Sequence, residues 1–144
     1  MVTLADIEGP KIVVLWSLTC VPCIKLLVAL QGFEKEMVSR GIKVVPLLIS
    51  SNMQQPQVYW QTVVYFLAKS LKGGSWQTYF SKLTPYYDSA GKVFDYMRVQ
   101  ATPTILLLSK TNQVVERKEG MQDWSSVQGN AELMMLLDTL AEAD

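Results

Sequence analysis

The feature that most constrains the fold is a pair of cysteines, Cys20 and Cys23, between an apolar run and a helical pattern. The run from Ile12 to Trp16 is apolar on both faces and rich in β-branched residues, which is typical of a buried strand. From Pro22 to Arg40, apolar residues recur at helical spacing while charged residues take the other side, which predicts a helix. The cysteines therefore lie at a strand-to-helix corner, and Cys20 stands at the start of the helix.

This corner predicts thiol–disulfide chemistry. Unpaired backbone N–H groups and the positive end of the helix dipole favour a thiolate at Cys20. Cys23 lies one turn further into the helix, within disulfide distance, and can attack the mixed disulfide that Cys20 forms with a substrate. Pro22 suits an early helical position, because no N–H donor is needed there. We therefore predict that both cysteines are catalytic.

Composition removes most competing chemistries. With no histidine, the chain lacks the commonest metal ligand and the usual base of nucleophilic catalysis. Thirteen basic residues balance thirteen acidic ones, so nucleic acid is not expected as a partner. A zinc site would need four ligands, and a structural disulfide that closes so short a loop would constrain the unfolded chain little. We predict no cofactor and no bound metal.

Two other functions compete with this prediction. A copper-binding or metallochaperone-type protein is the alternative, because two cysteines and seven methionines offer soft ligands for Cu(I). The missing histidine argues against it. A peroxidase is disfavoured as well, because Thr19 directly precedes Cys20 and the spacing of a peroxidatic loop is absent from the sequence.

The rest of the pattern predicts a single α/β domain over residues 1–144. Pro46 cannot donate to a strand ladder, so its strand is expected at an edge or with a bulge. Gly32 is expected to kink the first helix, and Asn130 to cap the last one. The elements expected after the first helix are a strand, a helical insertion, an antiparallel hairpin and a final helix, at residues 43–50, about 52–84, 104–109 with 113–117, and 131–141.

Four landmarks along the chain resemble the TlpA/ResA group of bacterial thioredoxin-like proteins. Val13 to Cys23 resembles the active-site strand and motif of that group, and Pro85 to Gly91 resembles its second landmark. Tyr96 to Thr104 is similar to the family segment that ends in a cis-proline. Gly120 and the Asp123-Trp124 pair resemble the closing segment. Four landmarks in the same order are far more specific than two cysteines alone.

The resemblance implies a thioredoxin-like fold, in which helices flank a central mixed β-sheet. It also implies that Pro103 is cis and faces the cysteines, where the Thr102 backbone would pair with an extended substrate as an added strand. Trp16 matches a family tryptophan near the active site. We predict substrate contacts at Trp16, Thr102 and Pro103, and at Val21 and Pro22 between the cysteines.

The resemblance further implies a thiol–disulfide oxidoreductase. We expect a reductase of disulfides in exported proteins, kept reduced by a membrane electron-donor protein and working as a periplasmic monomer. Val14 and Leu26 occupy positions where relatives carry acidic residues that handle protons, so proton transfer would use water. Apolar runs in the sequence are far shorter than the roughly 20 residues of a membrane span, so a signal or anchor would precede residue 1.

Overall fold

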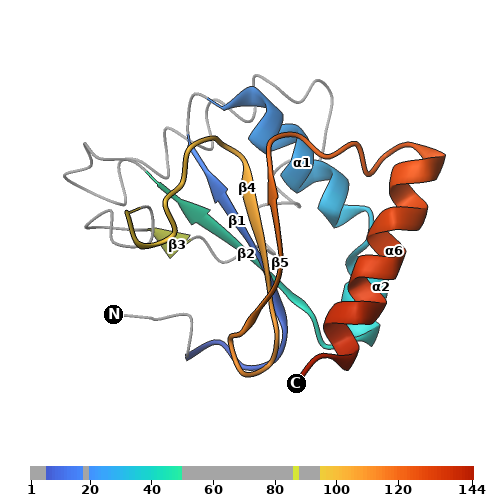
Figure 1. Ribbon diagram of the computed structural model, residues 1–144. Helices are drawn as coiled ribbons and strands as arrows, with labels where there is room; N and C mark the ends of the chain where they lie inside the picture. The colour runs from blue at the N-terminus through green and yellow to red at the C-terminus, as the bar shows by residue number, and fades with distance from the viewer. Residues whose placement is uncertain (1–5, 18–19, 50–85, 88–94) are drawn as a thin grey trace.

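A computed structural model describes residues 6–17, 20–49, 86–87 and 95–144, and Figure 1 shows how their helices and strands are arranged. The described strands form one mixed sheet in the order β3-β2-β1-β4-β5. Parallel pairs join β1 to β2 and β2 to β3, and antiparallel pairs join β1 to β4 and β4 to β5. The strands are β1 (Lys11–Trp16), β2 (Lys43–Leu48), β3 (Tyr86–Tyr87), β4 (Thr104–Leu108) and β5 (Val114–Glu119).

Three described helices, α1 (Val21–Gln31), α2 (Glu34–Ser39) and α6 (Val127–Glu142), lie together on one side of this sheet (Figure 1). The helical insertion predicted at residues 52–84 lies outside the described residues. The hairpin predicted at residues 104–117 is confirmed, with β5 extending to Glu119. Nothing among the described helices is long and apolar enough to cross a membrane.

The central strand β1 is buried on both faces, as its apolar run predicts. Val14 and Trp16 join the cluster under the helices, whereas Val13 and Leu15 join a second cluster on the opposite face. Because side chains alternate along a strand, a run of apolar residues can serve two cores only between two layers. This burial fixes the end of β1, and with it the start of α1.

The helix predicted from Pro22 to Arg40 is divided into α1 and α2. The division lies at Gly32, the position of the predicted kink. Gly32 ends α1, where its N–H donates to the Ala29 carbonyl at 3.1 Å and the N–H of Phe33 donates to the Leu30 carbonyl at 3.0 Å. Phe33 and Met37 are then buried in the same cluster as the cysteines. The break allows the second half of the pattern to turn and bury these two side chains.

The edge position predicted from Pro46 is wrong for β2 as a whole, because β2 lies between β1 and β3. The proline is nevertheless accommodated by local pairing. Lys43 and Ile49 donate toward β1, and backbone donors alternate in direction along a strand, so Pro46, three residues from each, faces the β3 side. The pairs recorded between β2 and β3 begin at Leu47, one residue after the proline. The missing N–H of Pro46 therefore removes no recorded ladder bond.

The last helix begins earlier than residue 131, so the predicted cap at Asn130 is wrong. α6 starts at Val127, and the hydroxyl of its N-cap Ser126 accepts from the N–H of Gly129 at 3.0 Å. Asn130 lies inside the first turns. Serine and asparagine are both strong N-cap residues, so the sequence alone does not show which of them caps the helix.

A lysine is buried at the end of the sheet remote from the cysteines. Lys11 begins β1 and is fully buried, and its Nζ donates to Asn112 Oδ1 at 2.6 Å. Lys43 is its partner across β1 and β2. Loss of water around the ammonium, and then repulsion from Lys43, lowers the pKa of Lys11 below its ordinary 10.5.

This lowered pKa predicts a pH-dependent difference between the wild type and Lys11→Met. Between the folded and unfolded pKa values of Lys11 the unfolded chain binds more protons, so wild-type stability rises with pH toward 10.5. Over this window we expect the free energy of unfolding of the wild type to rise relative to that of Lys11→Met. The rise is at most about 1.4 kcal/mol per pH unit for one proton.

Urea denaturation of both proteins between pH 7 and 10.5 measures this difference, because groups that titrate in both proteins cancel. Lys43→Met is the matched control. It removes the repulsion but leaves Lys11 buried, so the rise in stability with pH should become smaller without vanishing. A stability difference that stays constant with pH would contradict the burial of a charged Lys11.

Candidate active site

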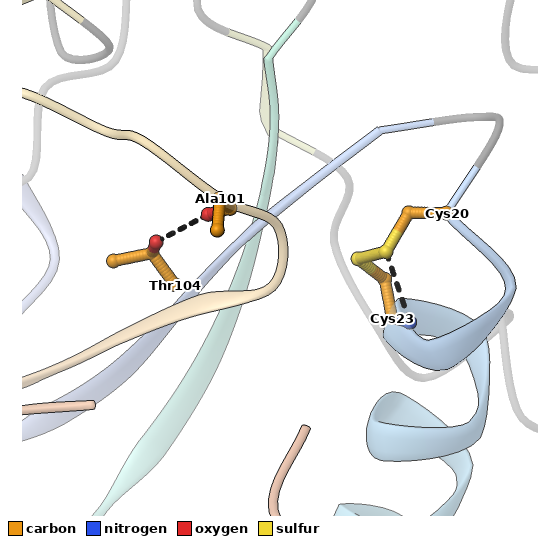
Figure 2. Close-up of a disulfide and its surroundings, with 4 residues drawn as sticks. All are labelled: Cys20, Cys23, Ala101 and Thr104. Atoms are coloured by element: carbon orange, nitrogen blue, oxygen red, sulfur yellow. Dashed lines mark hydrogen bonds between the residues drawn. A yellow bond between two sulfur atoms is a disulfide. The ribbon is translucent and has the colours of Figure 1, made fainter. Parts of the chain in front are cut away.

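The two cysteines lie where β1 meets α1 and form a disulfide (Figure 2). β1 ends at Trp16, and the N–H of Cys20 donates to the Ser17 carbonyl at 3.2 Å. Cys20 is the N-cap of α1, and its Cα lies 5.3 Å from that of Cys23. The predicted strand-to-helix corner is confirmed, together with the pairing of the cysteines across it.

The sulfur of Cys20 occupies the place of a capping oxygen. The backbone N–H of Cys23, in the first helical turn, donates to Cys20 Sγ at 3.2 Å (Figure 2) and also to the Cys20 carbonyl at 3.2 Å. When the disulfide is reduced, the same N–H faces a thiol or thiolate at Cys20. A helix N-terminus favours the charged form, so this position is suited to a nucleophilic thiolate at Cys20.

Burial distinguishes the two sulfur-bearing residues. Cys20 is 7% exposed and Cys23 is 0% exposed. Both residues are buried, and of the two Cys20 keeps the small exposed surface. Cys23 is enclosed in an apolar cluster that also contains Val14 and Leu26, both fully buried. Neither of these two positions supplies an acid beside the cysteines, in agreement with the sequence.

A second segment reaches the same end of the sheet from β4. Thr104 is paired with Leu15, so the preceding Pro103 lies beside the end of β1. The Thr102–Pro103 peptide bond is cis, as the family resemblance implies. Figure 2 shows the turn from Ala101 to Thr104 opposite the disulfide. The structure therefore places the predicted proline segment and the cysteines at the same end of the sheet.

Hydrogen bonds hold this turn at two carbonyls. Thr104 Oγ1 donates to the Ala101 carbonyl at 2.6 Å (Figure 2), and the Gly120 N–H donates to the Pro103 carbonyl at 2.8 Å. Thr102 is half-buried, and no recorded hydrogen bond between described residues uses its backbone. The turn is therefore fixed on both sides of Thr102.

The predicted contact residues differ in accessibility. Val21 is 53% exposed and Pro22 is exposed, so both can meet a substrate beside Cys20. Trp16 is 1% exposed and packs in the cluster with both cysteines, so in this oxidised structure it offers no surface to a substrate. The last residue of a strand buried on both faces stays below the surface, and Trp16 belongs to the same apolar cluster as the disulfide.

The Thr104 hydroxyl is a part of this site that the sequence motifs do not reveal. Thr104 is 0% exposed at the head of β4, whose other residues are all aliphatic. A lone hydroxyl in a wholly buried strand needs a hydrogen-bond partner, and this was the available signal. The signal does not reveal that the partner is the Ala101 carbonyl, because that depends on the turn.

No group of three or more histidine, cysteine or acidic side chains suited to a metal ion occurs among the described residues. The described geometry therefore offers a disulfide at a helix N-terminus and a fixed backbone turn opposite it. A dithiol in this position can exchange with an incoming disulfide.

No protein-family model and no curated protein matches the chain. Solved structures do match it. The thioredoxin domain of a thiol-disulfide oxidoreductase from Bacteroides vulgatus has a TM-score of 0.65 and 12% identity, covering 94% of this chain and 85% of that one.

Two further structures are similar at comparable levels. A secreted Mycobacterium tuberculosis disulfide oxidoreductase homologous to E. coli DsbE has a TM-score of 0.62 and 13% identity, covering 94% of this chain and 86% of that one. StoA from Bacillus subtilis has a TM-score of 0.60 and 19% identity, covering 89% and 84%. The chain has a thioredoxin-like fold, as predicted, and at these identities the likeness establishes the fold.

Proposed function

We propose that this protein is a thiol–disulfide oxidoreductase that works through Cys20 and Cys23. The observation that carries the proposal is the disulfide at the N-terminus of α1, with Cys20 partly exposed and the Thr102–Pro103 turn opposite it. The names of the structural neighbours support the same activity, since two of them are described as disulfide oxidoreductases.

The exchange takes place in two steps. The Cys20 thiolate attacks one sulfur of a substrate disulfide, that S–S bond breaks, and a substrate thiolate leaves while a mixed disulfide forms. Cys23, as a thiolate, then attacks Cys20 Sγ, and the second substrate sulfur leaves. The substrate gains two electrons and two protons, and the Cys20–Cys23 pair is oxidised. Val14 and Leu26 carry no acid, so water supplies and accepts the protons.

Reduction is the direction we propose, on substrates that are disulfides in exported proteins. The Val21-Pro22 pair between the cysteines lacks the histidine of strongly oxidising relatives. The sequence landmarks resemble the TlpA/ResA group, and one structural neighbour is a secreted protein. These features support a periplasmic monomer that receives electrons from a membrane electron-donor protein. Contacts of Val21, Pro22, Thr102 and Pro103 with the substrate belong to the same proposal.

The reduction potential of the Cys20–Cys23 couple tests the direction. We expect a value near or below about −220 mV, the range of reducing dithiols, because no histidine lies between the cysteines to favour the reduced form. Equilibration with glutathione buffers, followed by trapping and mass measurement of free thiols, gives this value. The same reduced protein should reduce insulin. A potential near about −120 mV would overturn the reductase assignment and leave an oxidant in its place.

A further inference from the structure

Arg117 of β5 is bound to the segment that leads into the Thr102–Pro103 turn. Its Nη1 donates to the Met97 carbonyl, and its Nη2 donates to the Arg98 carbonyl at 3.2 Å. Nε and Nη2 also donate to Glu119 Oε1, at 3.1 and 2.9 Å. The carboxylate thus orients the guanidinium, and the guanidinium holds two successive carbonyls of another segment.

These two carbonyls lie at the entry to the turn. Arg98 has a left-handed backbone, with φ at 50°, and ends a helical turn. Val99 follows and is buried against the face of the sheet opposite the helices. Three residues later the chain reaches Thr102. Arg117 therefore fixes the start of this segment, and the Gly120 bond to the Pro103 carbonyl fixes its end, just before β4.

We propose that Arg117 is a positioning residue for docking of protein substrates, an inference that rests on the proposed function. It holds the segment from Met97 to Thr102 in the place where a substrate backbone pairs with Thr102. Arg117 acts through this segment and lies on β5, whereas the nucleophile Cys20 is held by α1. Loss of Arg117 should disturb docking and leave the thiol chemistry of Cys20 unchanged.

The shape of the guanidinium matters to this role. Arginine presents five N–H donors in one plane, and here three nitrogens serve two carbonyls and one carboxylate. Lysine keeps the charge but cannot make this set of bonds in a fixed plane. Arg117→Lys should therefore recover only part of what Arg117→Met loses.

The test compares insulin with a small aromatic disulfide as substrates of the reduced, full-length protein. We expect Arg117→Met to raise the KM for insulin about 10-fold, since small displacements of positioning groups have effects of this order or larger. The rate with the small disulfide should stay within about twofold of wild type. Amide hydrogen exchange at residues 100–102 should become faster, because the entry to the turn is released.

Arg40→Met is the matched control. Arg40 also joins a side chain and a carbonyl, donating to Asp138 at 2.8 Å and to the Glu36 carbonyl at 2.7 Å, on the helical side of the molecule. Equal slowing of both substrates, or equal effects of the two arginine variants, would overturn the positioning role. Unchanged exchange at residues 100–102 would overturn it as well. A wild-type protein that reduces neither substrate would instead refute the proposed function, whatever the exchange rates show.

Discussion

Cys23→Ser is expected to trap a substrate protein as a mixed disulfide through Cys20, whereas Cys20→Ser is expected to trap little or nothing. Cys20 is partly exposed and receives the N–H of Cys23 at its sulfur, so it attacks first. Release of the substrate requires the second thiol, at 0% exposure one turn deeper, and serine cannot provide it. Turnover should fall by roughly 1,000-fold or more in both variants, the scale expected when a covalent nucleophile is removed.

Trapping is measured by non-reducing electrophoresis of each variant. Each variant is first incubated with a fraction of exported proteins or with insulin. The complex should survive denaturation and disappear with dithiothreitol, and mass spectrometry then identifies the bound protein. The double variant Cys20→Ser/Cys23→Ser is the control for non-covalent association. Equal trapping by the two single variants would show that either sulfur can attack, and the assignment of Cys20 as nucleophile would have to be abandoned.

The parts of the fold that are local in sequence were predictable. The strand that ends at Trp16, the helix that starts beside Cys20 and the hairpin of β4 and β5 each depend on side chains close together in the chain. Their periodicity determines strand or helix directly. The proximity of Pro103 to the cysteines was also foreseen, but through family resemblance, since no local pattern links two segments so far apart.

The features that were wrong or missed depend on neighbours that the sequence does not specify. Pro46 argues for an edge, and the actual position of β2 depends on where Tyr86–Tyr87 pairs with it. Trp16 matches a family position near the site, yet its exposure depends on the layers that cover β1. The bonds of Arg117 to Met97 and Arg98 join segments about 20 residues apart, and no spacing rule predicts them. Tertiary contacts decide each of these cases.

The segment between β5 and α6 connects the site to the last helix. Gly120 donates to the Pro103 carbonyl, and Trp124 is buried in the cluster that contains both cysteines. Gly129, in the first turn of α6, lies directly against this segment. A Cβ at Gly129 would overlap the carbonyl oxygen of Asp123 and would lie 2.7 Å from its carbonyl carbon. The two nearest atoms belong to the Asp123 backbone, which cannot move aside as a flexible side chain would.

Gly129→Ala is therefore expected to lower the free energy of unfolding by about 3 kcal/mol, the upper end of the usual effect of overpacking. Gly41→Ala is the matched control, because Gly41 has a left-handed φ of 68° and the described residues leave the space around its Cβ open to 4 Å. That variant should lose only about 1 to 2 kcal/mol, from backbone conformation alone. Urea denaturation of the oxidised proteins measures both values. A smaller loss for Gly129→Ala than for Gly41→Ala would show that α6 can move away from Asp123 freely, and that the close approach does not fix the segment that carries Trp124.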